Sequence, residues 1–279
     1  MQEIEISQSL DFSVSMCVYN GDNPEHFKTA VESVLNQTCK PDEVVLVVDG
    51  PVTETLNEII TDYEKSDIFN VIRLPENAGH GNARRIGLEN CKYELVALMD
   101  ADDISVPERF EKQLEVFKEN NDISLVGGNI SEFINEPENT VGNRTVPQND
   151  SEIKTYMKKR CPMNQVTVIF KKTAVNNVGG YIDWYCDEDY YLWIRLALAG
   201  YKFTNIGETL VNVRVGKEMY SRRGGVKYFK SEAKLQKYMF SKKMISLPRY
   251  LINVTERLIL QVLMPNKLRG FIFRKFARQ

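Results

Sequence analysis

The feature that most constrains this chain is a regular alternation of short apolar runs and helical patterns through roughly its first 130 residues. Between the runs, apolar residues recur every three or four positions, which is typical of the buried face of a helix. This alternation predicts an α/β fold in which a mostly parallel, Rossmann-like sheet is flanked by helices. The predicted strands are residues 12–18, 44–48, 69–74, 95–99 and 124–127, with a later one at 166–170.

One of these strands leads directly into a cluster of acids. Residues 95–99 are all apolar, as in a strand buried on both faces of a parallel sheet, and Asp100, Asp102 and Asp103 follow. Open α/β sheets bind ligands at this edge, and clustered carboxylates there favour a divalent cation or a cation-bridged phosphate. The alternative for the same acids is capping of the next helix, which Pro107 would open.

Two further acidic positions belong to the same argument. Asp49 ends the strand at 44–48, so it lies at the same edge of the predicted sheet. Asp187, Glu188 and Asp189 lie at the start of a predicted helix, where carboxylates stabilise the helix dipole. They can also serve the cleft, provided that one of them points into it. Sugar transfer from a nucleotide diphosphate needs a cation for the leaving group and a carboxylate for the acceptor proton.

The net charge of −2 hides a strong asymmetry along the chain. From Arg214 to Gln279 there are 17 Lys and Arg against three acids, whereas the rest carries 35 acids against 19 bases. This split predicts that the C-terminal quarter faces an anion: membrane phospholipid, a lipid diphosphate, nucleic acid or the acidic body of the protein. Nucleic acid is disfavoured because no binding motif is recognisable. An apolar stripe at 250–264 indicates an amphipathic helix suited to an anionic bilayer.

Cysteine usage and hydropathy predict the compartment. The five cysteines are an odd number without C-x-x-C spacing, which argues against a disulfide framework or zinc site and suits a reducing cytoplasm. The first ten residues carry acids and no apolar core, and no apolar run approaches 18 residues, so neither a signal peptide nor a membrane span is expected. We expect a cytoplasmic protein, peripheral to the inner face of the cell membrane.

Seven short motifs, taken together, resemble those of the family 2 inverting glycosyltransferases with the GT-A fold. The resemblance covers residues 13–215, and it is specific because of the order and spacing of the motifs. They are SVSMCVYN (13–20), AVESVLNQT (30–38), VVDG (47–50), NAG (77–79) followed by Ala83-Arg84, DADD (100–103), GGY (179–181) and EDYYLW (188–193). The tail, with YSRRGG at 220–225, resembles the non-processive branch that builds bacterial surface polysaccharides.

The resemblance implies a domain plan and an activity. Residues 1–215 would form the GT-A domain, with a nucleotide-binding half at about 12–130 and an acceptor half at about 131–215, and 216–279 a basic helical extension. The implied activity is a metal-dependent, inverting, non-processive transfer of a hexosyl unit. The donor would be a nucleotide-diphosphate sugar, by default a UDP-sugar, and the acceptor a lipid-linked glycan.

The resemblance also implies roles for individual residues. Asp102 would hold Mn²⁺ or Mg²⁺, while Asp103 would lie behind it or cap the next helix. Asp189 would be the catalytic base, with Glu188 as the fallback. Residues implied to bind the nucleotide sugar are Cys17, Val18, Tyr19, Asp49, Arg84, Asp100, Arg222 and Arg223.

Several of these assignments have alternatives. Arg84 is either a ligand of the diphosphate or a solvated helix residue, and Arg222 and Arg223 belong either to a loop over the diphosphate or to a membrane-facing patch. His26 and His80 are expected on the surface or in loops. Gly50 stands where many relatives carry a second acid that reads the base, which leaves the nucleotide open.

Two other functions stay open from the sequence alone. A non-catalytic GT-A scaffold in a membrane biosynthetic complex would keep the fold, although acids at all three sites disfavour it. A sugar-nucleotide pyrophosphorylase would need a Gly-rich, Arg-containing loop after the first strand, and this chain has YNGD at 19–22.

Overall fold

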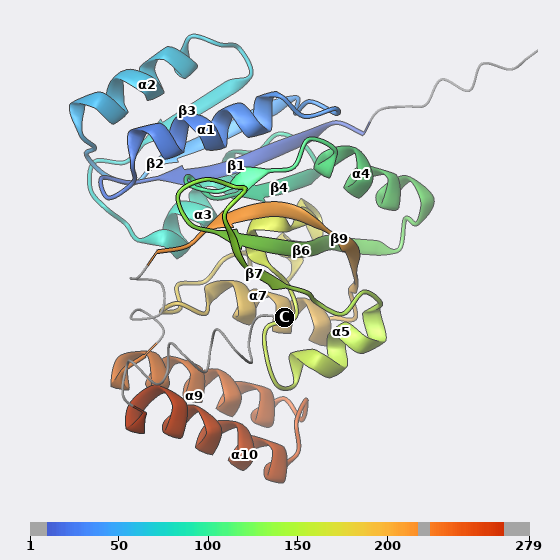
Figure 1. Ribbon diagram of the computed structural model, residues 1–279. Helices are drawn as coiled ribbons and strands as arrows, with labels where there is room; N and C mark the ends of the chain where they lie inside the picture. Colours follow the sequence, from blue (N-terminus) through green and yellow to red (C-terminus); the bar gives the residue numbers. More distant parts are fainter. Residues whose placement is uncertain (1–9, 217–223, 265–279) are drawn as a thin grey trace, which may run out of the picture.

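The computed structural model describes residues 10–216 and 224–264, and in this part of the chain nine strands form one mixed sheet (Figure 1). The strands are β1 Phe12–Val18, β2 Glu43–Val48, β3 Phe69–Arg73, β4 Leu95–Met99, β5 Ile104–Ser105, β6 Ile123–Phe133, β7 Thr140–Arg144, β8 Ile169–Lys171 and β9 Lys202–Arg214. Their order is β3-β2-β1-β4-β8-β6-β9-β5, and β7 pairs with β6 outside that path. The strands β3, β2, β1 and β4 are parallel, as predicted.

Beyond β4 the sheet departs from the prediction. β8 lies between β4 and β6 and runs antiparallel to both, so the sheet is mixed. The strand predicted at 166–170 is wrong in its bounds, because a 3₁₀ turn, η1 Gln165–Thr167, precedes β8. β6 continues beyond the predicted 124–127 to Phe133. From Ile123 to Phe133 it pairs with β9, a 13-residue strand that the sequence analysis missed.

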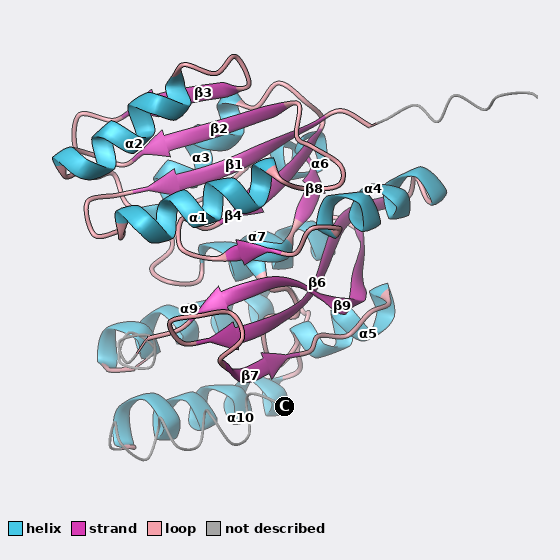
Figure 2. Ribbon diagram, turned by 45° about the horizontal axis from the view of Figure 1, so that its top comes forward, coloured by secondary structure: helices cyan, strands magenta, loops and turns pink. Residues whose placement is uncertain are grey.

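The described helices lie on both faces of the sheet (Figure 2). They are α1 Pro24–Leu35, α2 Glu54–Glu64, α3 His80–Asn90, α4 Arg109–Glu119, α5 Asp150–Met157, α6 Lys172–Asn177, α7 Glu188–Leu198, α9 Val226–Ser241 and α10 Leu247–Leu258, which a π-helical turn, η2 Ile259–Leu263, extends. The α1 start is as predicted: the Asn23 side chain accepts hydrogen bonds from the amides of Glu25 and His26, and Pro24 opens the helix.

Two apolar clusters hold the layers together. Successive residues of β2 point to opposite faces, so Val44 and Leu46 pack with α1 and α2 while Val45 packs with α3 and the second half. The second cluster joins α3 to α7, whose Trp193 is fully buried, and to α9 through Leu235. This core fixes the carboxyl ends of β1, β2 and β4 at one edge. None of the helices described is long and apolar enough to cross a bilayer.

Candidate active site

The parallel strands bring the predicted donor residues to one edge. β1 pairs with β2 from Ser13 to Val18 and with β4 up to Met16, so the residues that follow these strands are neighbours. Asp49 comes directly after β2 and Asp100 directly after β4. This is the position where open α/β sheets bind ligands.

Asp49 holds a loop as well as lining the edge. Its buried carboxylate accepts a hydrogen bond from the Ala78 amide at 2.6 Å, and its carbonyl accepts one from the Asn77 side chain at 3.2 Å. Asp49 therefore seats the loop that leads into α3. Its role in closing the base pocket stays a prediction.

The glycine after Asp49 has a local structural reason. Gly50 has a φ of +85°, and a Cβ built on it would lie 2.7 Å from the backbone nitrogen of Asn77. A side chain here would be strained by the backbone and would press on the loop. The loop after β2 and the loop before α3 therefore approach each other closely at this position, which disfavours an acid or any other side chain there.

Arg84 lies behind Asp100 in the interior. Its guanidinium is buried, donates to the carbonyl of Ser15 at 2.9 Å and to that of Met99 at 3.2 Å, and pairs with the Asp100 carboxylate. The solvated alternative for Arg84 is therefore wrong. These contacts fix the orientation of Asp100, whereas contact between Arg84 and a diphosphate stays a prediction.

The other acids after β4 are held by β9. The Asp103 carboxylate accepts from the Arg214 amide at 2.8 Å, and the Asp102 carbonyl accepts from the Arg214 Nε at 3.2 Å. The capping alternative is wrong for these acids, because α4 begins at Arg109 with Glu108 at its N-cap position.

The Asp102 carboxylate lies in a crowded acidic setting. Burial, followed by the charges of Asp100 and Asp22, raises the pKa of Asp102 to about 6. Carboxylate oxygens in such a setting are the donors that Mg²⁺ and Mn²⁺ prefer. Within residues 10–216 and 224–264, no three His, Cys, Asp or Glu side chains group as metal ligands, so a cation here would need further oxygens from its substrate.

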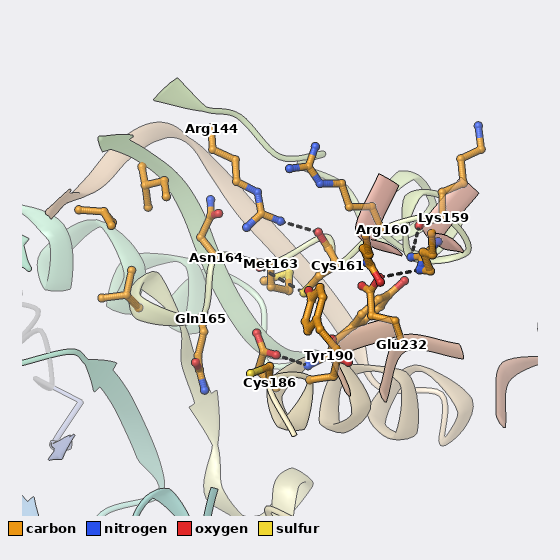
Figure 3. Close-up of a pocket in the computed structure, with 18 of the residues that line it drawn as sticks. Arg144, Lys159, Arg160, Cys161, Met163, Asn164, Gln165, Cys186, Tyr190 and Glu232 are labelled. Atoms are coloured by element: carbon orange, nitrogen blue, oxygen red, sulfur yellow. Dashed lines mark hydrogen bonds and ion pairs between the residues drawn. The ribbon is translucent and has the colours of Figure 1, made fainter. Parts of the chain in front are cut away.

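The proposed base lies in a cavity of about 510 Å³ that Asp100 also lines. Asp189 is half-buried at the start of α7, and its carboxylate accepts from the Tyr190 amide at 2.6 Å. Burial, and next the charge of Glu188, raises the pKa of Asp189 to about 6. Figure 3 labels Tyr190 and Cys186 among the residues that line this cavity, and it shows Arg144 donating to the Cys161 carbonyl, a contact of 2.7 Å.

Glu188, the fallback base, is engaged elsewhere. Its carboxylate lies 2.7 Å from Nδ1 of His80, the first residue of α3. His80 thus joins the donor-side loop to the helix that bears Asp189, a contact that the sequence analysis missed. The position of His80 directly after Asn77-Ala78-Gly79 was the available signal. Of the two acids, Asp189 is the one that lines the cavity.

The remaining predicted donor residues surround the end of β1. Cys17 is half-buried, and burial raises the pKa of its thiol to about 11, so it stays neutral. Val18 is buried, whereas the Tyr19 ring is exposed and packs over Gly21. Asp22 accepts from the Tyr19 amide at 2.9 Å, closing a tight turn at 19–22. Arg222 and Arg223 lie outside the described residues.

The C-terminal helices supply a polar wall that the sequence analysis did not identify. Glu232 of α9 pairs with Arg257 of α10 at 2.9 Å and accepts from the Gln261 amide, and all three line the cavity. Arg257 also donates to the Lys159 carbonyl at 3.0 Å. These residues are far apart in sequence, and no local pattern links them.

Comparison with known proteins places this geometry in context. The model of a family described as Glycosyl transferase family 2 matches residues 13–181. The UDP-Gal:alpha-D-GlcNAc-diphosphoundecaprenol beta-1,3-galactosyltransferase of Escherichia coli is 36% identical, over 96% of this chain and 97% of that protein. The amylovoran biosynthesis glycosyltransferase AmsE of Erwinia amylovora is 34% identical, over 95% and 98%.

Solved structures support the fold. S. aureus TarS 1–349 in complex with UDP-GlcNAc matches with a TM-score of 0.65 at 18% identity, over 90% of this chain and 73% of that one. The mannosyltransferase PcManGT from Pyrobaculum calidifontis, in complex with GDP-Man and Mn²⁺, matches with a TM-score of 0.62 at 13% identity, over 92% and 71%. The predicted GT-A architecture is confirmed, with its mixed sheet and C-terminal helices.

Proposed function

The chain belongs to glycosyl transferase family 2 and is a glycosyltransferase of bacterial polysaccharide biosynthesis, and from this premise we propose that it moves one sugar, with inversion, from a nucleotide diphosphate to a lipid-linked glycan. The observation that carries the proposal is one cavity lined by both Asp100, on the donor side, and Asp189, the proposed base. The E. coli relative, whose name gives a lipid diphosphate acceptor, supports the acceptor class.

The donor is a nucleotide-diphosphate sugar. Cys17, Val18 and Tyr19 line the base pocket and Asp49 closes it. A UDP-sugar is the default, supported by the UDP-GlcNAc complex among the structural neighbours and the UDP-Gal in the name of the E. coli relative. The other neighbour holds GDP-Man, so the nucleotide must be measured.

Asp102, with Asp100 beside it, would hold Mn²⁺ or Mg²⁺. Their carboxylate oxygens fit a hard cation, and crowding among Asp22, Asp100 and Asp102 makes a positive charge favourable there. When bound, the cation would neutralise the departing diphosphate. Arg84 orients Asp100 from behind, and Arg214 holds the backbone of Asp102.

Asp189 removes the proton from the acceptor hydroxyl. The hydroxyl oxygen then bonds to the anomeric carbon as the bond from that carbon to the diphosphate oxygen breaks, which inverts the configuration. A pKa of about 6 leaves Asp189 ionised at neutral pH and makes it a stronger base than an ordinary aspartate. Arg222 and Arg223 are assigned to the departing diphosphate.

The nature of the acceptor indicates where in the cell the protein works. A lipid-linked glycan is presented at a membrane, so we assign the protein to the cytoplasmic face, in peripheral contact with anionic lipid through its C-terminal region. Nucleic acid is not among the proposed partners.

A thermal-shift panel tests the donor site. UDP, GDP, CDP and dTDP would each be added with and without Mn²⁺ to the wild type and to Asp102→Ala. We expect one diphosphate to raise the Tm only with the metal, and Asp102→Ala to abolish that rise. If no diphosphate stabilises folded protein, and no donor is hydrolysed or transferred, the scaffold alternative replaces this proposal.

A further inference from the structure

The last described helix buries its polar face and exposes its apolar face, the reverse of an ordinary surface helix. The residues that α10 and η2 bury are polar: Asn253, Arg257 and Gln261. Their outer face is apolar, with side chains between 37% and 67% exposed: Leu247, Leu251, Ile252, Leu258, Ile259 and Leu263. A surface helix normally turns its apolar stripe toward the core.

Polar contacts hold the inner face of α10 to α9 and to the loop after α5. Asn253 donates to the Lys158 carbonyl at 2.8 Å and to the Gln236 side chain at 2.7 Å. Arg257 donates to the Lys159 carbonyl and pairs with Glu232. The body of the protein therefore takes the polar side of the helix, and the apolar side is left for another partner. A contiguous exposed apolar face of this kind marks an interaction site.

The surroundings of this face favour an anionic lipid surface. Phe240 of α9 stacks on Tyr250 of α10, with ring centroids 5.3 Å apart, and extends the exposed apolar surface. Exposed lysines accompany it on α9 and in the turn before α10: Lys230, Lys237, Lys242 and Lys243. An apolar helix face accompanied by cations is the pattern of helices that lie in a bilayer interface.

The remaining sequence adds to the same charge. Residues 265–279 contain five Lys or Arg, no acid, and the apolar run Phe271-Ile272-Phe273. A second copy of this chain is a poorer partner, because a two-fold contact would bring the same lysines together.

We propose that the apolar face of α10 and η2 inserts into the interface of an anionic bilayer. The opposite face contributes Arg257 and Gln261 to the wall of the cavity that holds Asp189. One helix would thus join the lipid surface to the acceptor cavity. The proposal rests on the proposed function in one respect, the lipid-linked acceptor. Figures 1 and 2 show α9 and α10 side by side at the end of the molecule away from α2 and β3.

Vesicle flotation tests the proposal. Full-length protein would be floated with phosphatidylethanolamine–phosphatidylglycerol vesicles and with phosphatidylcholine vesicles, alongside the double variant Leu251→Glu/Leu258→Glu. The matched control is Val141→Glu on β7, which is also half-exposed and apolar. We expect the wild type and the control to float with the anionic vesicles, and the double variant to bind at least tenfold more weakly while keeping its Tm.

The remaining readouts separate this proposal from the proposed function. Transfer to a short-chain, water-soluble acceptor should be unchanged in the double variant, while transfer to a vesicle-embedded acceptor falls. Equal flotation of variant and wild type would overturn the proposal, as would a wild type that binds neither vesicle. Dimers in light scattering that the double variant dissolves, without vesicle binding, would assign the face to a second copy. Vesicle binding without any diphosphate-dependent Tm rise would instead count against the proposed donor site alone.

Discussion

Two helices of this protein, α1 and α10, have the same kind of amphipathic pattern and use it in opposite ways. α1 buries Phe27, Ala30, Val31 and Val34 against the sheet. α10 buries Asn253 and Arg257 and exposes its leucines. The spacing of apolar residues predicts an apolar stripe on a helix. It does not show whether that stripe packs against the protein core or against another surface, such as a bilayer.

The same contrast separates the two sides of the active site. The donor edge stands on strands whose burial is apolar and continuous, so its position follows from the core. The wall of the proposed acceptor cavity is instead lined in part by polar contacts among Glu232, Arg257 and Gln261. Changes on the two sides should therefore have separable effects.

The largest expected effect is on chemistry, from Asp189→Asn. Loss of the general base should lower kcat by about 10²–10⁴-fold. The diphosphate-dependent Tm rise should persist, because the donor edge is built from other strands. Steady-state transfer assays and the thermal-shift panel measure the two quantities. Glu188→Gln is the control, with a smaller loss expected because His80 occupies that carboxylate. Wild-type turnover in Asp189→Asn would remove the assignment of the base.

A second prediction concerns the polar wall, through Arg257→Met. Removing the guanidinium leaves the half-buried Glu232 carboxylate near Asp187 without its cation, at a cost of about 3 kcal/mol of unfolding free energy. Urea unfolding measures this cost, and kinetics should show a raised acceptor KM with an unchanged donor KM. The double variant Glu232→Gln/Arg257→Met should recover part of the stability. A raised donor KM would show that the two sides are not separable.

The donor side was predicted well because its strands and helix starts depend on residues that are close together in the sequence. Residues 44–48 of β2 and all of β4 are apolar, β1 is apolar except for Ser13 and Ser15, and α1 carries its own capping signals at Asn23 and Pro24. The acids that follow these strands reach one edge through topology alone, so Asp49 and Asp100 needed no knowledge of side-chain contacts.

In the second half of the chain, the sequence analysis missed strand structure where strand pairing does not follow the hydrophobic pattern. β6 is buried throughout although it contains Asn129, Ser131 and Glu132, and its register with β9 shifts around Asn129. These shifts break the two-residue period that a sequence reading needs. The His80–Glu188 pair and the burial of Arg84 depend on contacts between distant segments, which no spacing reveals.

A third prediction tests how closely the donor edge is packed, through Gly50→Ala. The positive φ costs about 1–2 kcal/mol for any side chain, and the approach to Asn77 adds to it, giving about 2–3 kcal/mol in total. Gly200→Ala is the matched control, since its φ is +88° and nothing lies within 4 Å of the added Cβ. Unfolding free energies of the two variants give the difference. Equal losses would mean that the loop at Asn77 yields freely.

The smallest expected effect links the two sides through pH. Asp189 must be a carboxylate to act as base, so activity should be present above its pKa of about 6 and lost as the pH falls through that value. Burial and Glu188 raise this pKa, whereas Arg144 and His80 lower it. His80→Asn removes one of the lowering charges, so the acid limb of kcat/KM should move upward, by less than about one unit.

The matched control for this last variant is His26→Asn, since His26 is not among the groups that act on Asp189. Profiles of kcat/KM from pH 5 to 8 would be recorded for both variants. A downward shift in His80→Asn, or an equal shift in His26→Asn, would contradict the coupling of the donor loop to the base. An upward shift confined to His80→Asn would mean that His80, at the start of α3, helps to set the pKa of Asp189. The donor and acceptor sides would then be separable in binding and in stability but coupled in proton transfer.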